Sequence, residues 1–118
     1  MAVGDIASKD RGSGARYNAG KARYDLIPIA SLKPAADVFE YGAGKYSAHN
    51  WLCGQNWTVP LASILRHIEA FQRGEDLDPE SGLPHVGHIL CNAVMLSHYY
   101  QYFSEGDDRI PSRFFQDE

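Results

Sequence analysis

The sequence predicts an all-α fold: a small helical bundle of three main helices with structured loops, completed by homo-oligomerisation. Apolar residues recur at spacings of three and four over residues 31–45 and 58–74, and over a third segment that begins near residue 79 or 83 and ends near 103. No pair of segments alternates in the manner of strands. The third helix is apolar over much of its circumference, so a neighbouring subunit is expected to cover it.

A single domain is expected from a chain of 118 residues. It should occupy residues 17–105 and lie between a flexible arm at residues 1–16, which is rich in glycine, serine and charged residues, and a C-terminal tail at residues 106–118. The net charge of −4 offers no general basic face, so no nucleic acid polymer is expected as a partner.

The cysteines and the apolar runs indicate the expected location. Cys53 and Cys91 form no Cys-x-x-Cys pair, which argues against a zinc knuckle and fits a reducing, cytoplasmic setting. The first residues lack the apolar run of a signal peptide. No segment reaches the ~20 consecutive apolar residues that span a bilayer, so no membrane association is expected.

Residues that favour helix ends mark the boundaries of the three helices. Ser31 is the predicted N-cap of the first helix, with Pro34 in its first turn, where a missing N–H costs little. Thr58 and Gly74 are predicted to cap the second helix at its start and end. Asp78 is predicted to cap the third helix.

One stripe of the third helix is polar. At about 100° per residue, the helix places four side chains on one side, namely His85, His88, Asn92 and Tyr99. Such a row predicts that this side faces a polar cavity. Three roles are open for its histidines: a hydrogen-bonded network with carboxylates of the preceding loop, ligand contact or proton transfer, and metal ligation.

Two residues of the second helix are candidates for the same cavity. His67 falls beside the apolar stripe and should face the same interior, whereas Arg66 falls on a more exposed side and could reach a ligand at a subunit boundary. The loop between the second and third helices is acidic. Its carboxylates suit Mg²⁺ bound against a phosphate, and the candidate ligands are Asp76, Asp78 and Glu80.

Two further segments combine glycine, a base and an aromatic residue. Residues 16–24 contain Lys21 and Tyr24, and residues 42–46 contain Lys45 and Tyr46. Glycine lets a ligand approach the backbone, lysine supplies charge and tyrosine supplies a stacking face. Neither segment has the full phosphate-binding P-loop frame.

These motifs together resemble a known family. Their order in the chain is Gly20-Lys21, Tyr24-Asp25-Leu26-Ile27-Pro28, Gly42-Ala43, Lys45-Tyr46, Asn50-Trp51, Arg66-His67, Gly74-Glu75-Asp76, Asp78-Pro79-Glu80-Ser81-Gly82-Leu83-Pro84-His85, His88 and Asn92. This string resembles the phage-associated family of dATP/dGTP diphosphohydrolase N-terminal domains, which is similar to the all-α, MazG-like nucleotide pyrophosphohydrolases. The resemblance covers most of the chain, roughly residues 16–100.

The resemblance implies a nucleotide-binding domain at residues 17–105 and hydrolysis of a (deoxy)purine nucleoside triphosphate to monophosphate and pyrophosphate. It implies Mg²⁺ (or Mn²⁺) on Asp76, Asp78 or Glu80, and proton transfer by His67 or His85. Substrate contacts would come from Lys21, Tyr24, Lys45, Tyr46, Asn50, Trp51, Arg66, His88 and Asn92.

One departure from the related enzymes keeps other functions open. MazG-like enzymes hold Mg²⁺ with Glu-x-x-Glu and Glu-x-x-Asp pairs, whereas this chain has His85-x-x-His88 on its third helix. One alternative is a non-catalytic phage protein that binds and sequesters a nucleotide or a nucleotide-derived defence signal. A purely structural helical oligomer is another.

Overall fold

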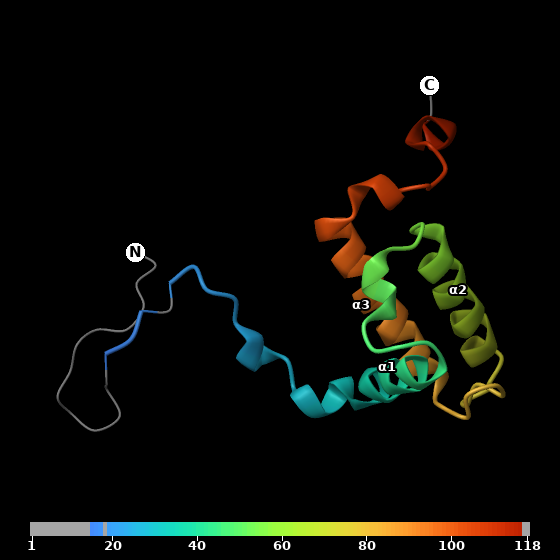
Figure 1. The fold of residues 1–118 in the computed structure, drawn as a ribbon, viewed down its shortest axis with the longest axis horizontal. Coiled ribbons are helices and arrows are strands. Elements are labelled where there is room, and N and C mark those ends of the chain that lie inside the picture. Colours follow the sequence, from blue (N-terminus) through green and yellow to red (C-terminus); the bar gives the residue numbers. More distant parts are fainter. Residues whose placement is uncertain (1–14, 18, 117–118) are drawn as a thin grey trace.

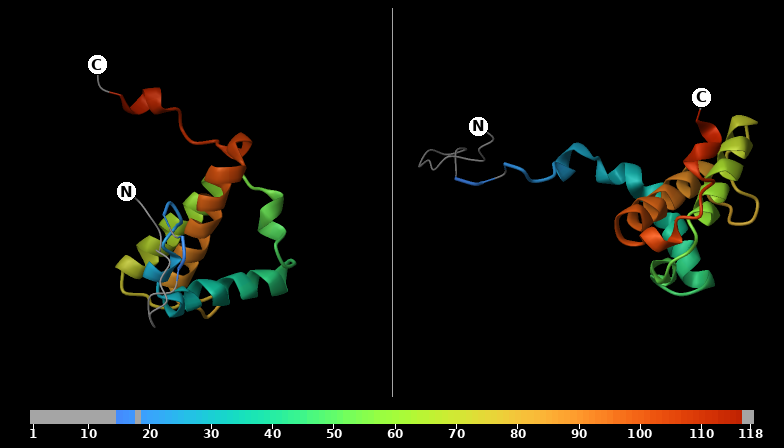
Figure 2. Two further views of the ribbon diagram at one scale, coloured as in Figure 1. Left: turned by 90° about the vertical axis from the view of Figure 1, so that its left-hand side faces the viewer. Right: turned by 90° about the horizontal axis from the view of Figure 1, so that it is seen from above.

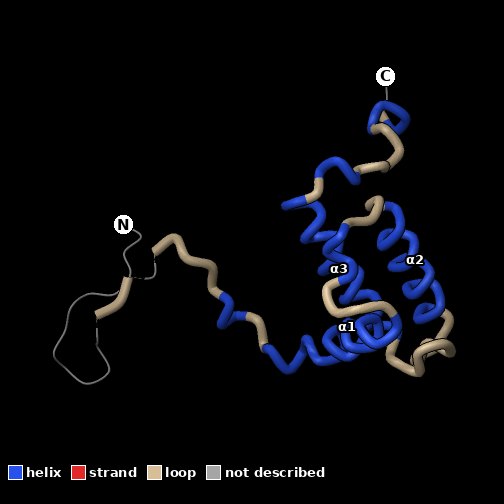
Figure 3. Tube along the Cα trace, in the orientation of Figure 1, coloured by secondary structure: helices blue, strands red, loops and turns tan. Residues whose placement is uncertain are grey.

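The computed structural model describes residues 15–17 and 19–116, and it confirms the all-α prediction. Three α-helices form the body, namely α1 (Lys33–Lys45), α2 (Thr58–Gln72) and α3 (His85–Tyr102). Short 3₁₀ helices lie before, between and after them, at Tyr24–Leu26, Ile29–Leu32, Asn50–Cys53, Ser104–Gly106 and Ser112–Phe115. The described part of the chain contains no strand, as Figure 3 shows.

Helix α3 is the central element, because both α1 and α2 pack against it. α2 and α3 run side by side in opposite directions, joined by the acidic loop, and α1 crosses them near the end of α2 and the start of α3 (Figures 1 and 2). A small apolar core joins α1 to α3 through Ala35, Val38 and Cys91, with partly buried side chains packed around it.

The crossing of α1 and α3 depends on a glycine. Gly87 lies in the first turn of α3, and a Cβ atom placed on it would lie 2.5 Å from the backbone carbonyl oxygen of Pro34. The two backbones are therefore closer here than any side chain permits. This contact fixes the start of α1 beside the start of α3, and it brings both next to the acidic loop.

The predicted capping residues are wrong for the starts of all three helices. α1 begins at Lys33 behind a 3₁₀ turn, so Ser31 does not cap it, although Pro34 does lie in the first turn. The N-cap of α2 is Trp57, not Thr58. The N-cap of α3 is Pro84, and no side chain caps that helix.

Hydrogen bonds outside the predicted capping pattern engage two of these residues. Asp108, far along the chain, accepts hydrogen bonds from the backbone N–H and the hydroxyl of Thr58, at 2.9 and 2.6 Å. Asp78 accepts hydrogen bonds within its own loop from the backbone N–H and hydroxyl of Ser81, both at 2.9 Å. The predicted end of α2 is close to the observed one, since Gly74 has a φ of +96° just beyond the helix.

The loop before α2 packs onto the body, as its two tryptophans predicted. The ring of Trp51 lies 5.6 Å from that of Phe39 and 5.2 Å from that of His98, measured between ring centroids. Trp57 is buried, and its indole N–H donates a hydrogen bond of 2.9 Å to the carbonyl oxygen of Phe103.

The segment before α1 extends away from the helices (Figure 1). All side chains from Lys21 to Ser31 are exposed. Most of the predicted flexible arm, residues 1–16, lies outside the described residues.

Homo-oligomerisation stays a prediction. Among the described helices, none combines the length and apolar character needed to cross a membrane.

Candidate functional site

A cavity of about 600 Å³ lies where α1, α2, the acidic loop and the start of α3 meet. Its volume falls within the roughly 300–1,000 Å³ typical of small-molecule sites. Nine of the residues predicted from the sequence line it, namely Lys45, Tyr46, Arg66, His67, Asp78, Glu80, His85, His88 and Asn92. The polar stripe of α3 therefore does face a cavity, at least as far as Asn92.

Five predicted site residues do not line this cavity. Lys21 and Tyr24 lie on the segment that projects from the body. Asn50 is exposed, and Trp51 packs against other aromatic rings. The side chain of Asp76 is also exposed, although its backbone carbonyl oxygen accepts a hydrogen bond of 2.9 Å from the N–H of His85.

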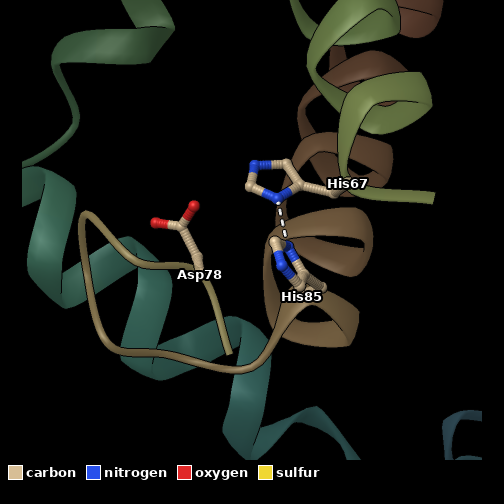
Figure 4. A group of neighbouring side chains, drawn as sticks. All are labelled: His67, Asp78 and His85. Carbon is tan, nitrogen blue, oxygen red and sulfur yellow. Dashed lines mark hydrogen bonds between the residues drawn. The ribbon is translucent and has the colours of Figure 1, made fainter. Parts of the chain in front are cut away.

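Three histidines gather on one wall of the cavity. His67 comes from α2, and His85 and His88 come from the first turn of α3. The Nδ1 atoms of His67 and His85 face each other at 2.8 Å, as the dashed line in Figure 4 marks. The ring of His67 also stacks on that of His88, with centroids 4.3 Å apart and an angle of 9° between planes. The ring plane of His67 is therefore fixed from two sides.

Two carboxylates anchor these histidines. The Nε2 atom of His85 lies 2.7 Å from Oε1 of Glu75, and the imidazole is almost fully buried. The Nε2 atom of His88 lies 2.7 Å from the hydroxyl oxygen of Ser81 and 3.7 Å from Oδ2 of Asp78. The predicted network between the histidines and loop carboxylates is therefore present, with Ser81 as a bridge.

The surroundings of these groups set their protonation. Burial lowers the pKa of His67, and the neighbouring His88 lowers it further. Burial also lowers the pKa of His88. Burial raises the pKa of Asp78, but hydrogen bonds from Ser81 and the nearby histidines outweigh this and leave it below its ordinary value. Neutral imidazoles and an ionised carboxylate are therefore favoured near pH 7, and these are the forms that bind metal ions.

One group of side chains in this wall has the composition of a metal site. His67, Asp78 and His85 each offer a donor atom, and these three atoms lie within 4.8 Å of one another. Figure 4 shows that the three side chains come from α2, the loop and the start of α3. This group shares only Asp78 with the three metal ligands predicted from the sequence.

The cavity lining also carries positive charge and aromatic rings. Lys45 and Arg66 line the cavity together with Tyr41 and Tyr46. The ammonium group of Lys45 lies 2.9 Å from Oε1 of Glu80 and 5.6 Å from the centroid of the Tyr46 ring. The hydrogen bond to Glu80, together with its negative charge, raises the pKa of Lys45. These side chains can bind an anion and a planar ring.

Sequence reasoning missed two residues that organise the site. Glu75 binds His85, and Ser81 links Asp78 to His88. The spacing Asp78-x-x-Ser81 is a recognisable signal, because Asp side chains often accept hydrogen bonds from the backbone a few residues on in tight turns. No comparable signal marks Glu75, since its partner is brought close by the packing of α3 on the loop.

Comparison with known proteins agrees with the resemblance read from the sequence. The family described as "dATP/dGTP diphosphohydrolase, N-terminal" matches residues 11–109. A curated relative, the dATP/dGTP diphosphohydrolase of Salmonella phage PMBT28, is 28% identical over 97 residues, covering 82% of this chain and 33% of the relative. The chain thus spans about a third of that relative's length. No solved structure matches this chain. On the extent of the family match, the chain belongs to the dATP/dGTP diphosphohydrolase N-terminal family.

Proposed function

We propose that this chain binds a (deoxy)purine nucleoside triphosphate in the cavity and hydrolyses it to the monophosphate and pyrophosphate. The observation that carries the proposal is that two cationic side chains, Lys45 and Arg66, line the same cavity as the histidine and carboxylate cluster. The side chains that can bind phosphate and those that can take part in hydrolysis therefore line the same cavity. The name of the phage relative supplies the substrate class.

The charges of the cavity support a cation-dependent reaction. Lys45 and Arg66 contribute two positive charges, whereas Glu75, Asp78 and Glu80 contribute three negative ones. A triphosphate adds several more negative charges, which this lining cannot neutralise. A divalent cation, Mg²⁺ or Mn²⁺, would supply the missing positive charge next to the phosphate oxygens.

The cavity accounts for the remaining parts of a nucleotide. Arg66 is exposed at the cavity wall, where its guanidinium group can bind two phosphate oxygens at once. Tyr41 and Tyr46 offer rings on which a purine base can stack. Asn92 lines the same cavity, but its amide N–H already donates a hydrogen bond of 2.8 Å to the carbonyl oxygen of His88. Its amide oxygen, which accepts no hydrogen bond from the described residues, can accept one from the base or sugar.

Turnover of the full chain over a panel of ribo- and deoxyribonucleoside triphosphates, with Mg²⁺ or Mn²⁺, tests the proposal. Separation of the products by chromatography should show monophosphate and pyrophosphate in equal amounts. Arg66→Ala should raise KM for a purine triphosphate. The control is Lys33→Ala, which removes an exposed lysine that pairs with Asp37 outside the cavity. It should leave KM unchanged.

The same panel separates the enzyme from a binding protein. Saturable nucleotide binding by the parent chain, with no product under any metal condition, would overturn hydrolysis. It would support sequestration of a nucleotide or a nucleotide-derived signal. Absence of both binding and turnover would overturn the whole assignment of the cavity to nucleotides.

A further inference from the structure

We infer that His67, His85 and Asp78 bind one divalent transition-metal ion, with two imidazole nitrogens and one carboxylate oxygen as ligands. The ion belongs to the class of Mn²⁺, Co²⁺ and Zn²⁺, and a site of this kind does not select Mg²⁺. The inference deepens the proposed function, because it names the cation and its ligands at the same cavity, and only the purpose of the ion rests on that function.

The donor atoms are already close to the positions that one ion requires. Bonds from such ions to nitrogen and oxygen are about 2.0–2.2 Å long, so two ligands of one ion lie between about 2.9 Å apart at a right angle and about 4.2 Å apart when opposite. The Nδ1 atoms of His67 and His85 are 2.8 Å apart. All three donor atoms lie within 4.8 Å of one another. The histidine pair must open slightly and the carboxylate must approach for all three atoms to bind one ion.

Hydrogen bonding fixes which nitrogen of His85 is free to bind a metal. The carboxylate of Glu75 can only accept a hydrogen bond, so Nε2 of His85, 2.7 Å away, carries a proton and donates it. In the neutral imidazole the lone pair is then on Nδ1, the atom that faces His67. A carboxylate that binds the outer nitrogen of a ligating histidine is a common feature of metal sites. Glu75 is the positioning residue for this ligand.

The second histidine is held by stacking. The ring of His67 lies parallel to that of His88, and His88 is itself fixed through Nε2 by the hydroxyl of Ser81 at 2.7 Å. The Nδ1 atom of His67 is thereby held facing His85. Without a metal, one proton lies between the two Nδ1 atoms. That proton belongs to His67. A divalent cation would bind both Nδ1 lone pairs, and the proton would move to Nε2 of His67.

The carboxylate of Asp78 is oriented by its own loop. Its Oδ2 atom accepts both hydrogen bonds from Ser81. Among the described residues, no hydrogen bond to Oδ1 is found, so this oxygen is free to bind the ion. The loop is fixed further by the backbone hydrogen bond of 2.8 Å from Asp78 N–H to the carbonyl oxygen of Leu83. Asp78 is thus placed before any ion binds.

The ligand types decide the class of metal. Mg²⁺ prefers oxygen ligands in a strict octahedral arrangement, whereas imidazole suits zinc, cobalt, iron and related ions. Two nitrogens in a set of three therefore disfavour Mg²⁺. This use of the histidines also changes their predicted role, because a ring with both nitrogens engaged cannot accept a proton from water. His85 is in that position, with Glu75 on one nitrogen and the ion on the other.

Titration of the full chain with Co²⁺, after removal of metal by a chelator, tests the site without any nucleotide. Visible absorption of Co²⁺ reports ligation by nitrogen and oxygen, and binding should saturate at about one ion per chain. Zn²⁺ should displace the bound Co²⁺. Mg²⁺ in large excess should not.

Two variants test ligands, one tests the positioning residue and one serves as the control. His67→Ala and Asp78→Asn should each weaken Co²⁺ binding more than about tenfold, and Glu75→Gln should weaken it about 10- to 100-fold. His67 and Asp78 are less buried than His85, so these variants keep the test independent of folding. The matched control is His49→Asn, because His49 lies outside the cavity and asparagine tolerates its φ of +63°.

Absence of saturable Co²⁺ binding would overturn the metal site, as would binding that His67→Ala and Asp78→Asn leave unchanged. These results are distinct from failure of the proposed function. Tight Co²⁺ binding without nucleotide turnover would keep the metal site and remove the hydrolase. Turnover supported by Mg²⁺ and unaffected by His67→Ala would keep the hydrolase and remove the role of this metal site in it.

Discussion

The hydroxyl of Tyr99, on α3, donates a hydrogen bond to the backbone carbonyl oxygen of Trp51, in the loop that connects α1 to α2. The same hydroxyl accepts a hydrogen bond of 3.2 Å from the amide of Gln55. Tyr99 is fully buried. One side chain of α3 therefore holds the loop that carries both tryptophans, and it does so from the far end of the polar stripe.

Tyr99→Phe should lower the free energy of unfolding by about 1–2 kcal/mol, because it leaves the Trp51 carbonyl oxygen without its buried partner. Urea denaturation followed by circular dichroism measures the change. Tyr102→Phe is the control, since that side chain is exposed and its hydroxyl can be replaced by water. Equal stability of Tyr99→Phe and the parent chain would show that the loop is held by ring packing alone.

The helices and the cavity wall were predictable because they depend on local periodicity. The rule of about 100° per residue placed His85, His88 and Asn92 on one face of α3, and His67 beside the apolar stripe of α2. The structure brings His67, His85 and His88 together as that rule implies. Tyr99 shares the stripe, but it lies too far along the helix to reach the cavity.

The missed features depend on contacts between distant segments. Asp108 binds the start of α2 from the C-terminal side of the chain, a pairing that no spacing near Thr58 reveals. Aspartate is a common N-cap residue, but the carboxylate of Asp78 instead accepts hydrogen bonds from Ser81 within the loop. Asp78 lines the cavity and Asp76 does not. This difference depends on the path of the loop, which the order of acidic residues in the sequence does not reveal.

Gly87→Ala should destabilise the protein by about 1–3 kcal/mol, because its new methyl group would overlap the carbonyl oxygen of Pro34. Either α1 or the first turn of α3 must shift. The matched control is Gly44→Ala, since Gly44 is also helical and a Cβ atom there meets nothing within 4 Å. This control should be neutral or slightly stabilising. Thermal unfolding of both variants measures the difference, and equal melting temperatures would contradict the close approach.

The free energy of unfolding of the metal-free chain should rise with pH between about pH 5 and 7. Burial lowers the pKa of His67 and His88 in the folded chain, whereas an unfolded histidine titrates near about 6.5. The unfolded chain therefore binds more protons just below that value, so the stability contribution is complete above it and is lost as the pH falls.

Denaturation at a series of pH values, with a chelator present, measures this dependence. His67→Gln should reduce the slope because it removes one of the two groups. A slope of opposite sign would mean that the folded chain stabilises the charged imidazoles.

The chain should form a homo-oligomer in solution through the outer face of α2. Leu65, Ile68 and Phe71 belong to the apolar stripe of this helix, yet they are 57%, 43% and 46% exposed. Light scattering at micromolar concentration should show a mass above that of one chain. Ile68→Lys should shift the mass toward the monomer, whereas Tyr102→Lys, at another exposed aromatic side chain, should not. A stable monomer for the parent chain would contradict the prediction.

Glu80→Gln should tighten nucleotide binding about two- to fivefold, a range that fits the modest strength of an exposed ion pair. Glu80 holds Lys45 at 2.9 Å, and both line the cavity. Removal of the negative charge releases the ammonium group for a phosphate and makes the cavity less acidic. If Glu80 instead ligates the cation, as the sequence alone suggested, the same variant should abolish turnover. Calorimetric titration and initial rates on one preparation separate these outcomes.

Asp76→Asn is the control for Glu80→Gln, since it removes an equal charge from the same loop without changing the cavity lining. It should change neither measurement, and loss of turnover in Asp76→Asn would show that the loop rearranges when nucleotide binds.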